Sequence, residues 1–296
     1  MSEIADRLVA PSRRLSLDEL AREWFAARIS VRIGGYGALA RDLDLLRRVR
    51  GGVGRVLMRG ASAEALAGRP CPWRPPCALD ILFREQGRDG PHGIPKPYVL
   101  AAEPHGRDLI LSLTLFGFAA DWAAAAAHAL AETVHRGIDW RGQRPGLFLP
   151  RPTITALTVS GVEGIDVPPP RALADLVFVT PVNREGDDPL ERPATLVARL
   201  ARRVEGLARW HDATIAADWT MLARAWGAMA YDIGLLQRGA VRRRSGRAGR
   251  GFAAGVVVGT LRLDDIPGEV WPLLAIGATT HIGKGASEGF GRYLIA

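Results

Sequence analysis

The run from His281 to Tyr293 combines residue types that can bind phosphate oxygens. It reads HIGKGASEGFGRY, so two Gly-x-Gly pairs enclose a short polar centre that contains Lys284. Glycine permits positive φ and close backbone approach, and the exposed amide groups of such a loop can surround an anion. A tight turn before a terminal strand is the other interpretation of this pattern. The residues predicted to bind the anion are Gly283, Gly285, Ser287, Gly289, Gly291 and Arg292.

A second candidate for phosphate binding is the run from Gln237 to Gly251, which interleaves arginine with glycine. No apolar residue in this run repeats at the period of a buried helix or strand. We expect a loop embedded in the fold, because an apolar strand follows at Phe252, and we expect it to become ordered on a polyanion. A solvated charged surface is the alternative. The residues predicted to make contact are Arg238, Arg242, Arg243, Arg244, Ser245, Arg247 and Arg250.

The elements that must position these runs follow from the apolar periodicity. In the first half of the chain we predict, in order, a strand at 23–33, one or two helices within 43–66, strands at 97–100 and 108–118, a helix at 121–134 and a strand at 153–159. Gly51-Gly52 lies between the helical patterns at 43–49 and 53–66, which could form one helix or two, and Asp121 is expected to cap the alanine-rich helix. The order of strand, helix, two strands, helix and strand is the ferredoxin-like plan.

The second half repeats this plan with one helical insertion. The predicted elements are a strand at 175–180, a helix that begins at Pro193, a helix at 219–236, a strand at 252–263, a helix at 269–278 and a strand at 292–295. On the helix that begins at Pro193, the arginines at 199, 202, 203 and 209 lie mostly away from the apolar stripe, which predicts a solvated or partner-facing position. The fold class is therefore α+β, with tandem ferredoxin-like domains at 1–165 and 171–296.

Composition favours a polyanionic partner. The chain has 296 residues, 48% of them apolar, which is enough for two cores. Its formal net charge is +8 and its pI is about 10.4, which indicates nucleic acid as a partner. Lys96 and Lys284 are the only lysines, and a GC-rich genome would by itself produce that bias toward arginine. Because no apolar run could span a bilayer and the N-terminal residues lack the basic, apolar and small-residue order of a signal peptide, we expect a cytoplasmic protein with no membrane partner.

The two cysteines, Cys71 and Cys77, lie in the sequence CPWRPPC. Two thiols cannot complete a tetrahedral zinc site, and although His92 could add one ligand, a fourth is not evident. We predict buried thiols in a rigid proline-rich loop. The sequence thus indicates neither a metal nor a cofactor.

Several of these segments together resemble a known family. The glycine pattern at 283, 285, 289 and 291 looks like the glycine-rich loop of RAMP-superfamily CRISPR proteins. The segment KPYVL at 96–100, the stretch 106–117 with its core LSLTLFG, and RRS at 243–245 leading into 255–260 resemble the branch that processes precursor CRISPR RNA. The resemblance covers about two thirds of the chain. It implies tandem ferredoxin-like domains, with CRISPR repeat RNA lying on a basic surface and meeting the glycine-rich loop.

The resemblance also implies metal-independent endoribonuclease chemistry, in which the 2′-hydroxyl attacks the adjacent phosphate and leaves a cyclic phosphate. Such cleavage requires a base, an acid and cationic groups for the phosphorane charge. Members of the family often place a histidine soon after the first strand, but no histidine precedes His92 here. The open candidates are His281, Tyr36 with Arg41 as a phosphate clamp, and His211 beside Asp212, whereas Lys284 is predicted to stabilise charge.

Two other functions of the same family fit the sequence. The missing early histidine favours a non-catalytic subunit that holds CRISPR RNA in a larger effector complex with other subunits. A backbone subunit that polymerises along the guide fits less well, because the tandem plan and the terminal glycine loop match the processing branch. A small-molecule enzyme is disfavoured, because the sequence has no metal-ligand cluster, nucleophile elbow or dinucleotide fingerprint, and no Walker-type spacing.

Overall fold

The computed structural model describes residues 3–89, 92–138, 151–184, 188–244 and 251–296. The chain forms two compact units, and each unit is made of three segments that are separate in the sequence. Unit 1 comprises Met1–Arg13, Trp24–Glu163 and Gly206–Thr214, and unit 2 comprises Arg14–Glu23, Gly164–Glu205 and Ile215–Ala296. In the described part of the chain, no helix has both the length and the apolar character needed to cross a membrane.

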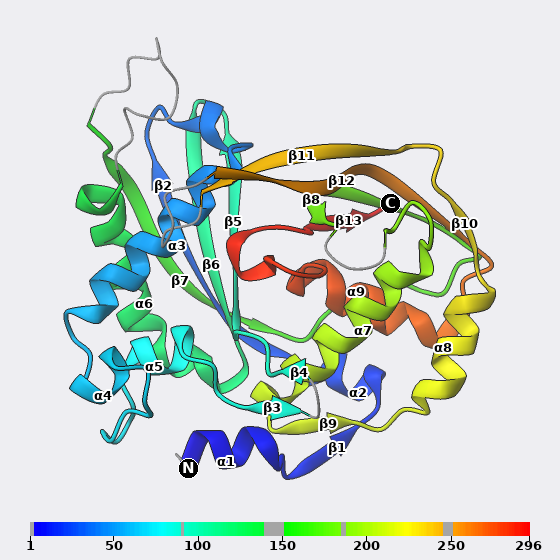
Figure 1. Ribbon diagram of the computed structural model, residues 1–296, viewed down its shortest axis with the longest axis horizontal. Helices are drawn as coiled ribbons and strands as arrows, with labels where there is room; N and C mark the ends of the chain where they lie inside the picture. The colour runs from blue at the N-terminus through cyan, green and yellow to red at the C-terminus, as the bar shows by residue number, and fades with distance from the viewer. Residues whose placement is uncertain (1–2, 90–91, 139–150, 185–187, 245–250) are drawn as a thin grey trace. The chain divides into compact units, whose positions relative to one another are not determined.

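Unit 1 is built on an antiparallel sheet of four strands in the order β5-β6-β2-β7. The strands are β2 (Phe25–Ile33), β5 (Tyr98–His105), β6 (Asp108–Phe116) and β7 (Ile154–Glu163). Helices α3 (Leu43–Met58) and α6 (Ala123–Glu132) pack against each other and against the sheet, as the left part of Figure 1 shows. Alternate residues of β2, such as Ile29 and Val31, are fully buried in this core. The arrangement is the ferredoxin-like fold predicted from the sequence.

Two details of unit 1 bear on the prediction. Helix α3 continues through Gly51-Gly52, which is one of the two predicted alternatives, and a Cβ at Gly52 would overlap the side chain of Thr133. The glycine therefore allows a close approach between two segments and does not break the helix. Asp121 does not cap α6 either, since the N-cap is Trp122 and makes no side-chain cap hydrogen bond.

Short elements complete this part of the chain. They are α1 (Glu3–Val9), α4 (Ala63–Leu66), α5 (Ala78–Phe83), β3 (Arg88–Asp89) and β4 (His92–Gly93), and a two-stranded sheet pairs β1 (Arg13–Leu15) with β9 (Ala213–Ile215). The loop before α5 contains the cysteines. Both thiols are buried and not disulfide-bonded, and the backbone N–H of Cys77 donates to Cys71 Sγ at 3.3 Å. This confirms the prediction of buried thiols.

Unit 2 repeats the ferredoxin-like plan around a five-stranded antiparallel sheet. Its strands are β8 (Leu173–Asn183), β10 (Ala230–Asp232), β11 (Leu236–Arg244), β12 (Gly251–Asp264) and β13 (Tyr293–Ile295), and its helices are α2 (Leu17–Arg22), α7 (Ala194–Ala208), α8 (Trp219–Ala228) and α9 (Trp271–Thr280). The order is β10-β12-β8-β13, and β11 also pairs with β12. Gly277 of α9 packs beside Leu200 of α7, and the hydroxyl of Tyr293 donates to the Leu274 carbonyl at 2.6 Å. These contacts connect both helices to the C-terminal strand.

Two predictions for unit 2 were wrong. The helix predicted at 219–236 ends at Ala228, because the chain then pairs with β12 as strand β10. The arginine-rich run predicted as a loop is largely strand β11, which pairs with β12 from Leu236 opposite Gly259 to Arg244 opposite Gly251. Figure 1 shows these two strands as a long ribbon. This segment is a strand because its backbone pairs with β12, and it buries no apolar face. The apolar periodicity of the sequence therefore did not indicate a strand here.

Candidate RNA-binding site

The glycine-rich loop, defined here as His281–Arg292, connects α9 to β13 in unit 2. Its four predicted glycines all have positive φ, between 70° and 89°, in the region that disfavours side chains. Internal hydrogen bonds close the loop, with the N–H groups of Glu288 and Phe290 donating to the Gly285 carbonyl at 2.7 and 3.2 Å. The loop therefore has a defined backbone and contains a short 3₁₀ turn at Ala286–Glu288.

Gly291 connects this loop to the sheet. Its N–H donates to the Pro181 carbonyl of β8 at 2.9 Å, and its carbonyl accepts from Ile282 N–H at 2.8 Å. A Cβ at this position would overlap the Ile282 carbonyl oxygen. Glycine is thus required both for φ and for space, and the two ends of the loop are held together.

His281 lies at the base of the loop and not on its surface. Its side chain is 3% exposed, and Nδ1 has no hydrogen-bond partner among the described residues. Burial lowers the pKa of His281 to about 3, assisted by the charges of Arg203 and Arg292, while backbone hydrogen bonds with Ala286 and Phe290 act in the opposite direction. The imidazole is therefore neutral at physiological pH and contacts both halves of the loop.

Two arginines of α7 lie against the loop. Arg203 is half-buried, its Nε donates to the Thr280 carbonyl at 2.7 Å, and its Nη2 has no hydrogen-bond partner among the described residues. Burial lowers the pKa of Arg203 to about 10, so it remains charged at neutral pH. Arg199 donates to the Asn183 carbonyl at 2.9 Å. The sequence predicted solvated or partner-facing positions for both, but each is half-buried, because α9 and the loop cover this side of α7.

The surface of the loop has the charge that the sequence predicted. Lys284 is exposed at its tip, whereas Ser287 and Arg292 are half-exposed. The Arg292 backbone joins the loop to β8, since its N–H donates to Thr180 Oγ1 at 2.9 Å and its carbonyl accepts from Val179 N–H at 2.9 Å. The exposed positive charge of Lys284 therefore lies on a loop whose backbone is held to the sheet by hydrogen bonds.

Arg238 of β11 belongs to an ion-pair cluster with the segment before α7. It lies 3.2 Å from Asp188 and 3.8 Å from Glu191, and Arg184 lies 2.6 Å from the same oxygen of Asp188. Arg238 is 57% exposed and Asp188 only 10%. Three further predicted residues, Arg242, Arg243 and Arg244, are on β11. Ser245, Arg247 and Arg250 lie outside the described residues.

The candidates in unit 1 are less accessible. Tyr36 is fully buried, at the N-cap of a 3₁₀ turn formed by Gly37–Leu39. His211 is also buried, between Trp24 and Phe25, which lowers its pKa to about 3. Neither group presents a titratable atom at the surface of the unit. Among the described residues, no three His, Cys, Asp or Glu side chains gather as metal ligands would.

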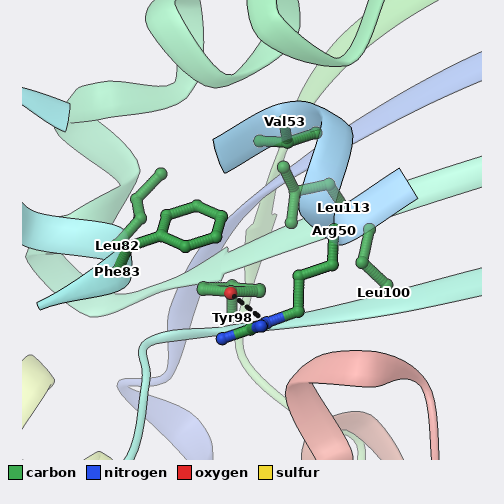
Figure 2. A pocket seen from close by; sticks show the side chains of 7 residues that line it. All are labelled: Arg50, Val53, Leu82, Phe83, Tyr98, Leu100 and Leu113. Carbon is green, nitrogen blue, oxygen red and sulfur yellow. Dashed lines mark hydrogen bonds between the residues drawn. The ribbon is translucent and has the colours of Figure 1, made fainter. Parts of the chain in front are cut away.

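Unit 1 contains a cationic cluster that the sequence did not reveal. Figure 2 shows Arg50 directed at Tyr98, and its Nε donates to the Tyr98 hydroxyl at 3.0 Å. The guanidinium also lies 5.3 Å from the centre of the Phe83 ring. Lys96 donates to the Phe83 carbonyl, and burial with the nearby charge of Arg50 lowers its pKa to about 8. The KPYVL segment supplied a signal, since it contains both Lys96 and Tyr98.

Models of known protein families match two parts of the chain. The family model for the CRISPR-associated endoribonuclease Cas6 matches residues 176–293. A second family model, described as an N-terminal domain, matches residues 48–148. The comparison with curated proteins found no match. The Cas6 match contains most of β8, together with α7, strand β11 and the glycine-rich loop.

Solved structures show the same fold. A product complex of Cas6 (TTHB231), a Thermus thermophilus protein, has a TM-score of 0.54 and 15% sequence identity, with 92% of this chain and 100% of that one covered. A product complex of Cas6 (TTHA0078) has a TM-score of 0.53 and 15% identity, with 92% and 99% covered. Over residues 176–293 the chain is therefore similar in sequence to the family of CRISPR-associated Cas6 endoribonucleases, and the whole chain shares the tandem ferredoxin-like fold of the two Cas6 structures.

Proposed function

We propose that this chain binds the repeats of precursor CRISPR RNA and cuts them, with the glycine-rich loop of unit 2 contacting the RNA backbone at the cleaved phosphate. The observation that carries the proposal is the exposed cation at Lys284 on a loop that His281, Arg203 and the sheet hold rigid. A rigid cationic loop requires no reorganisation when charge develops on a phosphate. The two Cas6 structures are complexes with product, which supports the same class of ligand here.

The proposed reaction needs no metal. The 2′-oxygen bonds to the adjacent phosphorus and loses its proton to a base, while the bond from phosphorus to the 5′-oxygen breaks and that oxygen gains a proton. The products carry a 2′,3′-cyclic phosphate and a 5′-hydroxyl. Lys284 would stabilise the additional negative charge on the phosphorane, and Ser287 and Arg292 would bind the neighbouring backbone.

We assign His281 a positioning role, and this changes the expectation from the sequence. A fully buried imidazole with a pKa of about 3 cannot take the proton of a bound 2′-hydroxyl without leaving its place. Its contacts with Ala286 and Phe290 instead maintain the loop. Tyr36 is also buried, so a proton transfer by Tyr36 would require unit 1 to open locally.

The test uses purified protein with the CRISPR repeat RNA of its host in EDTA, beside RNAs with a single 2′-deoxy group at each candidate position. We expect cleavage in EDTA that one deoxy substitution abolishes, and a cyclic phosphate on the upstream product. Cleavage that requires added Mg²⁺, or that survives every deoxy substitution, would refute the proposed reaction.

The second candidate is a non-catalytic subunit that holds CRISPR RNA, and the burial of both His281 and Tyr36 favours it. The same experiment separates the two functions. Tight binding without cleavage under any ionic condition would establish the subunit role. Absence of both binding and cleavage would contradict both functions.

A further inference from the structure

Cys71 and Cys77 lie just beneath the surface of a short loop in unit 1. Three of the five residues between them are prolines, and each proline fixes its own φ, so the loop has few accessible conformations. Residues 72–75 are exposed, whereas the two cysteines are only 5% and 7% exposed. The indole N–H of Trp122 donates to the Pro76 carbonyl at 2.7 Å. The loop is therefore held in place, with both sulfur atoms on its inner side.

The two sulfur atoms are held next to each other. The backbone N–H of Cys77 donates to Cys71 Sγ at 3.3 Å, and the two thiol groups hydrogen-bond to each other. Both also contact Ser62, whose hydroxyl bonds to Cys71 and whose backbone N–H bonds to Cys77. Ser62 is itself buried at the N-cap of α4, where its Oγ accepts from Ala65 N–H at 3.1 Å. The fold thus brings both thiols to one fixed residue.

The surroundings of the two thiols differ. Burial alone would raise the pKa of the Cys71 thiol, but hydrogen bonds outweigh this effect and lower it below its usual value. They come from the Ser62 hydroxyl, the N–H groups of Cys77 and Trp73, and the Cys77 thiol. Burial raises the pKa of the Cys77 thiol, and the adjacent Cys71 sulfur also raises it. Negative charge is therefore favoured on Cys71, and the proton on Cys77.

This arrangement is unlike that of an inert buried cysteine. A thiol in apolar surroundings has a raised pKa and does not react, whereas a stabilised thiolate beside a second thiol is sensitive to oxidation. We propose that Cys71 and Cys77 are a redox-active pair, in which a peroxide converts the two thiols into a disulfide that a thiol reductant opens again. The inference does not depend on RNA binding or cleavage.

The proposed oxidation has two steps. The Cys71 thiolate first attacks one oxygen of hydrogen peroxide, the O–O bond breaks, and the departing hydroxide takes up a proton to become water. The Cys71 sulfur is then a sulfenic acid. The Cys77 sulfur loses its proton and attacks the Cys71 sulfur, so that the S–O bond breaks and a second water leaves. Two thiols have become a disulfide, and the peroxide has been reduced to water.

The disulfide also protects the site. A sulfenic acid without a nearby thiol can be oxidised further to a sulfinic acid, which thiol reductants do not restore. Because the Cys77 thiol already contacts Cys71, it can react with the sulfenic acid before this occurs. The pair should therefore respond to peroxide reversibly.

The experiment treats the full, reduced chain with hydrogen peroxide at neutral pH and then adds maleimide in denaturant. Mass spectrometry of the peptide that contains both cysteines measures the result. We expect two maleimide groups before oxidation, and afterwards none, with the loss of two hydrogen atoms. Dithiothreitol should restore both maleimide groups.

Variants assign the role of each sulfur. Cys77→Ser should stop at a sulfenic acid on Cys71, which dimedone labels, whereas Cys71→Ser should react with peroxide at least about tenfold more slowly than Cys77→Ser. Ser62→Ala removes a hydrogen bond to the Cys71 sulfur and should slow oxidation of the pair by at least about threefold. Ser112→Ala, at another buried serine of unit 1, is the matched control and should leave the rate unchanged.

Three outcomes would overturn the proposal. They are two cysteines that still take up maleimide after peroxide treatment, a disulfide that links two chains, and equal rates for Cys71→Ser and Cys77→Ser. Circular dichroism of each variant distinguishes a lost thiol contact from a lost fold. A serine variant of either cysteine that fails to fold would be replaced by the alanine variant.

Discussion

The glycine-rich loop and strand β11 both contain residues predicted to bind RNA, yet they are held in place by different interactions. The loop depends on groups at its base, since the buried His281 and the half-buried Arg203 lie beneath it and Gly291 connects it to β8. Strand β11 depends on backbone pairing with β12, and its Arg238 is more than half exposed. Substitutions of the covered groups and glycines that hold the loop should therefore alter folding and function together, whereas substitutions of exposed cations, on the loop or on β11, should alter mainly charge.

This difference suggests two separate contributions to RNA binding by a strongly basic chain, namely affinity for any polyanion and a fixed position for one phosphate. Exposed arginines attract any polyanion, and their contribution decreases with added salt. A rigid loop can instead fix the position of one phosphate. Four predictions separate these two contributions.

The largest effect is expected from Gly291→Ala. Its Cβ would overlap the Ile282 carbonyl at a φ of +70°, so the free energy of unfolding should fall by at least about 3 kcal/mol. Gly227→Ala is the matched control, because this helical glycine has open space around it and should stabilise α8 by up to about 1 kcal/mol. Urea denaturation measures both, and equal effects would show that the loop is not rigid.

Lys284→Ala should change function without changing stability. Loss of a charged contact to phosphate costs about 1.5–3 kcal/mol, which weakens binding or cleavage of repeat RNA roughly tenfold or more. Arg224→Ala removes the same charge from an exposed position on α8 and should change affinity less than about twofold. Filter binding and single-turnover cleavage measure the two variants. Wild-type values for Lys284→Ala would remove the loop from the mechanism.

The pH dependence tests the buried position of His281. Its pKa of about 3 in the folded chain lies below the ordinary value of about 6.5, so protons bind the unfolded chain more readily. This contribution to stability is complete above pH 6.5 and is lost as the pH falls toward 3, at about 1.4 kcal/mol per pH unit for one proton. His281→Asn should flatten the stability curve over that range. An unchanged slope would mean that His281 is accessible in the folded state.

The smallest effect is expected at the ion-pair cluster of Asp188. Arg238→Ala should weaken RNA binding a few-fold and reduce the slope of log affinity against log salt by about 0.7. Asp188→Asn removes the carboxylate that neutralises Arg184 and Arg238, so it should strengthen binding at low salt. Titrations at several salt concentrations check both variants. Changes in the same direction would contradict an electrostatic role for the cluster.

Local patterns predicted most of the fold. The alternation in β2 and the leucine stripe of α7 identified these elements, because each has one face that must be buried. The same approach failed for β11, which has no apolar face, and it left open whether Gly51-Gly52 breaks the helix, where Gly52 in fact provides a close contact. Composition alone could not distinguish these cases, because the deciding partners, β12 and Thr133, are distant in sequence.

The sequence by itself determined the tandem ferredoxin-like plan, the glycine-rich loop and the excess of positive charge, since these depend on local periodicity and residue type. Only the tertiary structure decided which charged and titratable groups face water. His281 and Arg203 belong to residue types that usually lie at the surface, but here His281 is buried and Arg203 is half-buried beneath α9 and the loop. Burial depends on contacts between distant segments, and the cost of removing charge from water then sets the pKa.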